Sequence, residues 1–109
     1  MTYATWHTRK EKREIEQRGG TPLAKYGTDG ILNGHPVEVR CCRKDDRFRI
    51  DKDTQKAMVA GKGTYIFVNS DGKEKSLPAK EVSQKLGNGH WFKDRDYPHK
   101  FLRKKEIFE

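Results

Sequence analysis

The stretch that decides the fold reads TDGILNGHPVEVRCC and covers residues 28–42. The Asn33-Gly34 dipeptide at its centre is the strongest short-range signal for a two-residue hairpin turn. It is flanked by the apolar pair Ile31-Leu32 on one side and by the β-branched residues Val37 and Val39 on the other. The stretch therefore predicts two antiparallel strands joined at residues 33 and 34.

The pairing that this turn imposes brings two carboxylates together. With a two-residue loop, Asp29 lies opposite Glu38, with their Cβ atoms roughly 5 Å apart on one face of the sheet, and Arg40 points to the same face. Like charges repel at that separation, so the pattern favours a hard divalent cation between the carboxylates, with magnesium as the simplest candidate. The alternative is a solvated hairpin face on which Arg40 neutralises Glu38.

The remainder of the chain predicts helices that alternate with strands. The run 64–68 is apolar and β-branched, which indicates a central strand buried on both faces of the sheet. Asp51 or Asp53 could cap a middle helix, and Pro78 suits the first position of a later helix. The expected elements outside the hairpin are an exposed helix over 8–18, a short strand over 21–26, a helix from about 51 to 61, the strand 64–68 and a helix over 79–86.

These elements fit one small domain. A chain of 109 residues is too short for two domains that each bury a core. We expect a single domain over 1–109, of α/β (α+β) class, with a mixed central sheet flanked by helices. Residues 8–70 would hold the core motifs, and 71–109 would hold a C-terminal helix followed by a basic and aromatic tail.

The composition indicates a polyanionic partner and argues against several classes of protein. Lys and Arg number 24 against 16 Asp and Glu, a formal net charge of +8 at pH 7, which favours nucleic acid as the partner. No apolar run approaches the ~20 residues that cross a bilayer and none resembles a secretory signal, so we expect a cytoplasmic protein without membrane contact. The adjacent Cys41 and Cys42 form neither a disulfide framework nor a zinc knuckle, and the four histidines lack paired ligand spacing.

The order of these motifs resembles that of a known family. The string Thr28-Asp29-Gly30 is followed by the segment 36–40, which reads PVEVR, then by a helix bearing Gln55 and by the hydrophobic strand 64–68. The pattern resembles the PD-(D/E)xK, or restriction-endonuclease-like, nuclease superfamily, and within it the small archaeal Holliday junction resolvases and Mrr-like nucleases. The match covers roughly residues 8–70 and implies a restriction-endonuclease-like core in the order α-β-β-β-α-β.

The resemblance implies a Mg²⁺-dependent endonuclease that hydrolyses phosphodiester bonds in DNA, with Mn²⁺ as a substitute for Mg²⁺. It makes Asp29 and Glu38 metal ligands, with the backbone carbonyl of Val39 as a further ligand. Gln55 falls where many members place a helical glutamine close to the active site. The catalytic candidates that follow are Asp29, Glu38, Arg40 and Gln55.

Arg40 stands where the superfamily usually has lysine, and Thr28 stands where it usually has proline. The Arg40 guanidinium stays protonated and cannot act as a base, but it can orient the attacking water or stabilise charge on the phosphate. Glu11 or Glu14 would match the acidic residue that some members carry on the first helix. The departure at Arg40 leaves an alternative, which is a non-catalytic nucleic-acid-binding protein of the same fold.

Basic residues after the hairpin are the candidate nucleic-acid contacts, and the alternative for them is a solvated loop. They are Arg43, Lys44, Arg47, Arg49 and Lys52. Aromatic residues in the C-terminal tail could stack on bases, but in so small a domain we expect packing or a homodimer interface instead. A third reading, an HNH-type metal nuclease, lacks the required ligand pattern at His90, Asp94 and His99.

Overall fold

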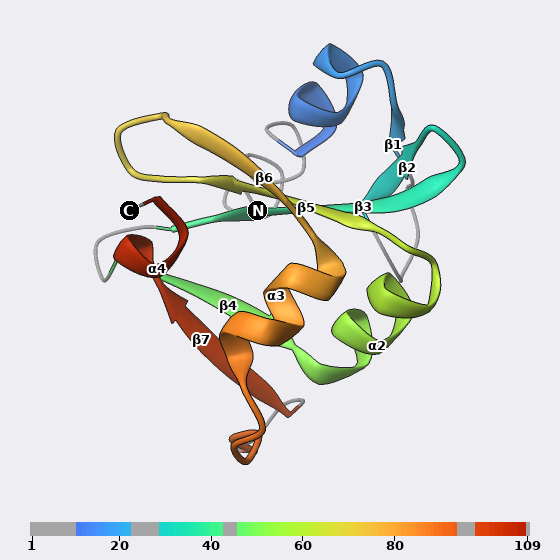
Figure 1. Cartoon of the computed structure of the whole chain (residues 1–109). Helices are drawn as coiled ribbons and strands as arrows, with labels where there is room; N and C mark the ends of the chain where they lie inside the picture. The colour runs from blue at the N-terminus through green and yellow to red at the C-terminus, as the bar shows by residue number, and fades with distance from the viewer. Residues whose placement is uncertain (1–10, 23–28, 43–45, 94–97, 109) are drawn as a thin grey trace.

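The computed structural model describes residues 11–22, 29–42, 46–93 and 98–108 (Figure 1). The expected small α+β domain with a mixed sheet and helices is confirmed. The first described element is the helical segment 11–17, which carries no label. The strands are β1 (Thr21–Pro22), β2 (Gly30–Leu32), β3 (His35–Cys41), β4 (Arg47–Asp51), β5 (Thr64–Val68), β6 (Glu74–Pro78) and β7 (His99–Arg103). The labelled helices are α2 (Lys52–Ala60), α3 (Ala79–Leu86) and α4 (Lys104–Phe108).

Five strands form the central sheet in the order β1-β2-β3-β5-β6, and β4 pairs with β7 in a separate two-stranded sheet. Within the central sheet β3 and β5 are parallel, and the other neighbours are antiparallel. A parallel pair needs a crossover connection, which β4 and α2 provide here. Because β5 lies between β3 and β6, its residues 65–68 are buried, as the sequence predicts.

The Asn33-Gly34 turn sets the register of the hairpin. The observed pairs are Gly30 with Val37, Ile31 with Pro36 and Leu32 with His35, which is the expected register. Asn33 and Gly34 both have positive φ, 55° and 81°, the backbone signature of a type I′ turn. The predicted hairpin is therefore confirmed pair by pair.

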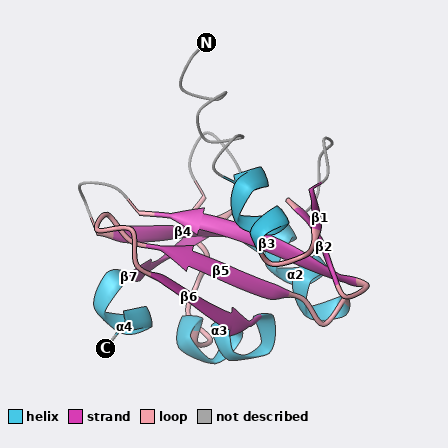
Figure 2. Ribbon diagram, turned by 90° about the horizontal axis from the view of Figure 1, so that it is seen from above, coloured by secondary structure: helices cyan, strands magenta, loops and turns pink. Residues whose placement is uncertain are grey.

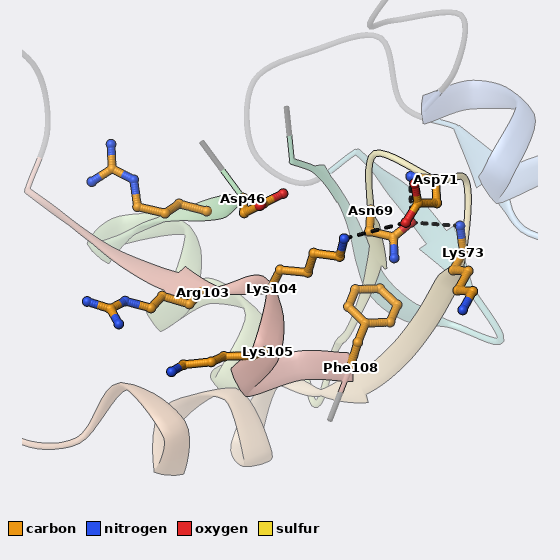
Figure 3. Close-up of a pocket in the computed structure, with 9 residues that line it drawn as sticks. Asp46, Asn69, Asp71, Lys73, Arg103, Lys104, Lys105 and Phe108 are labelled. Carbon is orange, nitrogen blue, oxygen red and sulfur yellow. Dashed lines mark hydrogen bonds and ion pairs between the residues drawn. The ribbon is translucent and has the colours of Figure 1, made fainter. Parts of the chain in front are cut away.

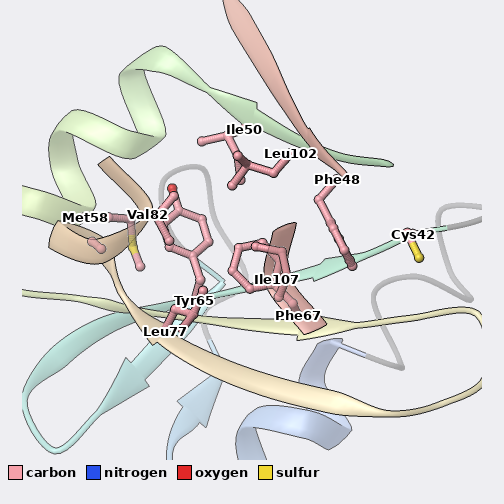
Figure 4. Close-up of a cluster of buried hydrophobic side chains, with 11 residues drawn as sticks. Cys42, Phe48, Ile50, Met58, Tyr65, Phe67, Leu77, Val82, Leu102 and Ile107 are labelled. Carbon is pink, nitrogen blue, oxygen red and sulfur yellow. The ribbon is translucent and has the colours of Figure 1, made fainter. Parts of the chain in front are cut away.

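Two apolar clusters cover the two faces of the central sheet. Ile15 of the segment 11–17 packs on one face against Val37, Val39, Ile66 and Val68. The larger cluster lies on the opposite face, where α2, α3 and the β4–β7 pair are packed (Figures 1, 2 and 4). Alternate residues of β5 point to opposite faces, so Ile66 and Val68 belong to one cluster and Tyr65 and Phe67 to the other. The larger cluster comprises Cys42, Phe48, Ile50, Met58, Tyr65, Phe67, Leu77, Ala79, Val82, Leu102 and Ile107.

The structure adds strands that the sequence pattern does not predict. β4, β6 and β7 each mix charged with apolar residues over five positions, which is too short to show a clear period. The segment 11–17 is not wholly exposed as expected, because Ile15 covers the sheet and is only 1% exposed. The expected strand 21–26 is described only as β1, since residues 23–26 lie outside the described residues.

The ends of the helices and the C-terminal aromatic residues fit their expected places in part. Asp51 and Pro78 are the N-cap residues of α2 and α3, and neither gives a side-chain cap hydrogen bond. Trp91 and Phe108 pack against the larger cluster, whereas Phe92 is 66% exposed.

In the described part of the chain, no helix has both the length and the apolar character needed to cross a membrane.

Replacing Ile66 by Val tests the packing of the central strand. Ile66 is fully buried, so loss of one methylene should lower the free energy of unfolding by about 1 kcal/mol. The matched control is Ile31→Val, because Ile31 is 41% exposed and the change should fall within about 0.5 kcal/mol. Urea unfolding of the two variants measures both values. Equal effects of the two substitutions would contradict the burial assigned to β5.

Candidate active site

The base of the β2–β3 hairpin brings Asp29 and Glu38 together. The backbone N–H of Asp29 donates to Oε1 of Glu38 at 3.0 Å, and the backbone N–H of Val39 donates to Oδ2 of Asp29 at 2.7 Å. Each carboxylate thus accepts a hydrogen bond from the backbone of the segment that carries the other. Asp29 lies just before β2 and not within it, so these side-chain bonds extend the contact between the two segments beyond the strand pairing.

Arg40 supplies the positive charge next to these carboxylates. Its Nη2 lies 2.6 Å from Oε2 of Glu38 and 3.7 Å from Oδ2 of Asp51 at the end of β4. The Glu38 side chain is 3% exposed and that of Arg40 is 24% exposed, so water screens the pair weakly. The ion pair between Arg40 and Glu38 is therefore present, but it lies in the interior and not on the solvated face that the sequence left as an alternative.

Burial makes this cluster of carboxyl groups favour the protonated form. Burial raises the pKa of Glu38 to about 8, even though Arg40 opposes that effect. Burial, and then repulsion from Asp29, raises the pKa of Glu11 to about 7. The pKa of Asp29 is also raised by burial, against the hydrogen bond from Val39 and the charge of Arg40. Three carboxyl groups therefore share one guanidinium.

The charge of Arg40 is stabilised in return by its neighbours. Burial alone would lower the pKa of Arg40, but the carboxylates of Glu38, Asp29 and Asp51 outweigh it and the pKa is raised. Nε of Arg40 is nevertheless buried without a hydrogen-bond partner in the described part of the chain. The guanidinium thus stays charged and keeps one donor that an acceptor from outside the chain could use.

The two candidate acids of the first helix differ in position. Glu11 is half-buried and close enough to the cluster that Asp29 and Arg40 both act on its pKa. Glu14 is buried, with 6% exposure, one residue before Ile15. The structure therefore places Glu11 near Asp29 and Glu38.

Among the described residues, Gln55 is linked to the carboxylates only through one intervening residue, Tyr65. Its Nε2 donates to the carbonyl oxygen of Ala79 at 3.0 Å and to Oγ of Ser83 at 2.7 Å, and its Oε1 accepts from the Tyr65 hydroxyl at 2.6 Å. Tyr65 is the register partner of Glu38 across β3 and β5. The amide of Gln55 thus ties α2 to α3 and β5, and its hydrogen bonds in the described structure do not join it to Asp29 or Glu38.

Three of the five candidate nucleic-acid contacts belong to the described part of the chain. Arg47 and Arg49 belong to β4, where they alternate with the buried Phe48 and Ile50. Lys52 is exposed at the first position of α2. The alternative prediction of a solvated loop is therefore wrong for Arg47 and Arg49, because both residues lie in a strand that pairs with β7. The remaining two candidates, Arg43 and Lys44, lie outside the described residues.

Sequence reasoning missed two residues of this site, Asp51 and Tyr65. The sequence predicts Asp51 only as a helix cap. In the structure its Oδ1 accepts a hydrogen bond from Nε of Arg49 at 2.8 Å, and its Oδ2 lies near Arg40. Burial raises the pKa of Tyr65, with further effects from Arg40, Glu38, Asp51 and Asp29, which places its hydroxyl beside the cluster. The only available signal was the alternation of charged and apolar residues in 47–51, which is typical of a half-buried strand.

The donor set of the cluster suits a hard cation. Asp29, Glu38 and Glu11 offer carboxylate oxygens, the ligands that Mg²⁺ and Mn²⁺ prefer. Their raised pKa values show that one guanidinium does not provide enough positive charge for all three. Within the described residues no group of three or more His, Cys, Asp or Glu is assembled for metal binding. Asp29 and Glu38 are the two acids that hydrogen bonds join directly in the described structure.

The comparisons with known proteins give this chain no family. No family model, no curated protein and no solved structure is similar to it at a significant level. The features of the cluster that bear on its chemistry are the buried pair of Asp29 and Glu38, the guanidinium of Arg40 beside Glu38, and the acid Glu11 nearby.

The raised pKa of Glu38 predicts how stability depends on pH. The pKa of Glu38 is about 8 in the folded state against an ordinary value of 4.5, so the folded state binds the proton more tightly. This stabilisation is complete below about pH 4.5 and is lost as the pH rises through 8. In the absence of divalent cations, we expect the melting temperature to be higher at pH 6 than at pH 8.5, by roughly 4 °C or more.

The control separates Glu38 from all other titrating groups. Glu38→Gln should remove most of the difference between pH 6 and pH 8.5, because the amide does not titrate. Glu81→Gln, at an exposed position on α3, should leave the difference unchanged. Parallel pH profiles of Glu38→Gln and the wild type in thermal unfolding would contradict the assigned pKa.

Proposed function

We propose that the protein is a metal-dependent endonuclease that hydrolyses phosphodiester bonds in DNA. The observation that carries this proposal is the buried cluster of Asp29 and Glu38 with Arg40, in which two carboxylates are held by each other's backbone and share one cation. A stability role alone explains this arrangement poorly, because a buried ion pair is often no better than apolar packing. Perturbed acids next to a fixed positive charge are common in active sites.

Asp29 and Glu38 are the residues that would hold Mg²⁺ or Mn²⁺, with the carbonyl of Val39 as the further ligand that the family resemblance implies. A bound divalent cation supplies a water of lowered pKa and shields the charge that develops on the scissile phosphate. Glu38 must release its proton to bind a cation, so its raised pKa makes metal affinity increase with pH. Glu11 adds negative charge from the first helix.

Arg40 serves as the electrostatic partner of the substrate phosphate. It cannot act as a base, since its pKa is raised above an already high value. Its buried Nε lacks an acceptor in the described structure, and a phosphate oxygen would satisfy this donor. A cation bound by Glu38 would compete with Arg40 for the same carboxylate, which would release the guanidinium toward the substrate.

The order of elements supports a restriction-endonuclease-like core. A helix, the antiparallel strands β1, β2 and β3, the helix α2 and the parallel strand β5 follow one another, with β4 inserted before α2. This order agrees with the α-β-β-β-α-β arrangement that the sequence resemblance implies, and the acids lie at the β2–β3 hairpin as that resemblance requires. We include a homodimer in the proposal, because two copies of the chain would supply one cluster for each strand of a duplex.

A second candidate function is nucleic-acid binding without catalysis. The observation in its favour is the contact of 2.6 Å between Arg40 and Glu38, which provides Glu38 with a permanent cation inside the chain. If this contact persists when DNA and metal are present, the cluster is structural. The net charge of +8 would then serve binding alone.

A cleavage assay on linear and branched duplex DNA distinguishes the two candidate functions. We expect the wild type to cleave with Mg²⁺ or Mn²⁺ and to be inactive with chelator. Asp29→Asn should lower the rate by about a hundredfold or more, because it removes a charged ligand. Arg40→Ala should lower the rate by roughly two to three orders of magnitude with little loss of DNA affinity, whereas Arg40→Lys should retain activity.

The control for this assay is Asp53→Asn, an exposed carboxylate in the first turn of α2, which should cleave like the wild type. A wild type that binds DNA without cleaving it, together with an Arg40→Lys variant that does cleave, would establish the non-catalytic alternative. Absence of DNA binding at low salt would reject both functions.

A further inference from the structure

A second site lies at the opposite end of β4 from the carboxylate cluster. Asp51 at one end of this strand lies near Arg40, and Arg47 at the other end lines a cavity of about 670 Å³. Between these ends β4 extends over roughly 14 Å, given the rise of a strand. β7 and α4 contribute further lining residues, and so does the turn between β5 and β6 (Figure 3).

The lining of this cavity is strongly cationic. Its charged residues are two carboxylates and five cations, and the cations are Arg47, Lys73, Arg103, Lys104 and Lys105. Lys104 extends toward Asp71, with Nζ 3.5 Å from Oδ2, so this pair neutralises only one charge of each sign (Figure 3). The side chains of Lys73, Arg103 and Lys105 have no ion pair within the described chain. The cavity therefore keeps an excess of positive charge.

Two of these cations face each other because of the strand register. Arg47 and Arg103 are direct partners in the antiparallel pairing of β4 with β7. Like charges at directly opposite positions destabilise a sheet. The guanidinium of Arg47 also lies 4.3 Å from the ring centroid of Phe101, the next residue on the same face of β7. An anion bound beside Arg103 would gain charge-assisted hydrogen bonds from its guanidinium.

We propose that this cavity binds a backbone phosphate of the DNA that reaches the carboxylate cluster. The identity of the polymer rests on the proposed function. The distance of roughly 14 Å along β4 equals the axial length of about four base pairs of duplex. Arg49 lies between the two sites, and its ion pair with Asp51 joins the middle of β4 to the cluster end of the strand. In Figure 3 Arg103 and Lys105 extend in the same direction, which suits contact with one strand of backbone.

Fluorescence anisotropy with a labelled duplex at several salt concentrations tests this site. Arg103→Ala and Lys105→Ala should each weaken binding about five- to tenfold at low salt and should reduce the salt slope by about one. Asp71→Asn should strengthen binding about two- to fivefold, because it removes a competing carboxylate and frees Lys104. Lys80→Ala, at an exposed position on α3 outside the cavity, is the matched control and should change neither quantity.

A second arm titrates inorganic phosphate and follows the backbone amide resonances of the cavity. Equal DNA affinity and salt slope in the wild type, Arg103→Ala and Lys80→Ala would overturn the proposal. Shifts with inorganic phosphate, combined with unchanged DNA affinity of Arg103→Ala, would assign the cavity to a small phosphorylated ligand and would also overturn it. A wild type that binds DNA through the cavity but cleaves none would reject the endonuclease and support the phosphate site.

Discussion

The ion pair between Arg40 and Glu38 is the interaction on which the rest of the structure depends. An ionised carboxylate with 3% exposure costs several kcal/mol unless it is paired and hydrogen-bonded. The guanidinium at 2.6 Å and the backbone N–H of Asp29 at 3.0 Å offset only part of this cost, so burial still raises the pKa of Glu38 to about 8. Both partners depend on the hairpin register, because a shift of one residue would turn Glu38 to the opposite face of β3. The turn at Asn33-Gly34 therefore controls both the fold and the chemistry.

The two faces of the central sheet differ in charge, because the buried charged side chains of β3 lie on one face only. Val37 and Val39 point to the face covered by Ile15, while Glu38 and Arg40 point to the face that carries Tyr65, α2 and the β4–β7 pair. On that second face the hydrogen bonds of Gln55 fix α2 against β5 and α3. Asp51 ends β4 beside Arg40, so the two-stranded sheet is joined electrostatically to the central one. The basic cavity lies at the other end of β4.

Local signals in the sequence were enough to predict the hairpin and its register, the proximity of Asp29 and Glu38, and the buried strand β5. They were not enough for β4 and β7, because the pairing of Arg47–Asp51 with His99–Arg103 joins segments about fifty residues apart that show no clear period. The partners of Arg40 could be predicted within its hairpin, as Glu38, but Asp51 reaches it only through that distant pairing. The basic cavity needs three such segments, and charge counts alone do not reveal which lysines meet.

Calorimetric titration of Mg²⁺ near pH 7 tests the central claim most directly, namely that the cluster of Asp29 and Glu38 is a cation site. Because the pKa of Glu38 is raised to about 8, a cation that binds it must displace a proton. Titrations in buffers of different ionisation enthalpy should therefore show release of roughly one proton for each bound ion, and both the binding and the release should be lost in Asp29→Asn. Absence of Mg²⁺ binding, or binding of equal affinity in Asp29→Asn without proton release, would contradict the claim.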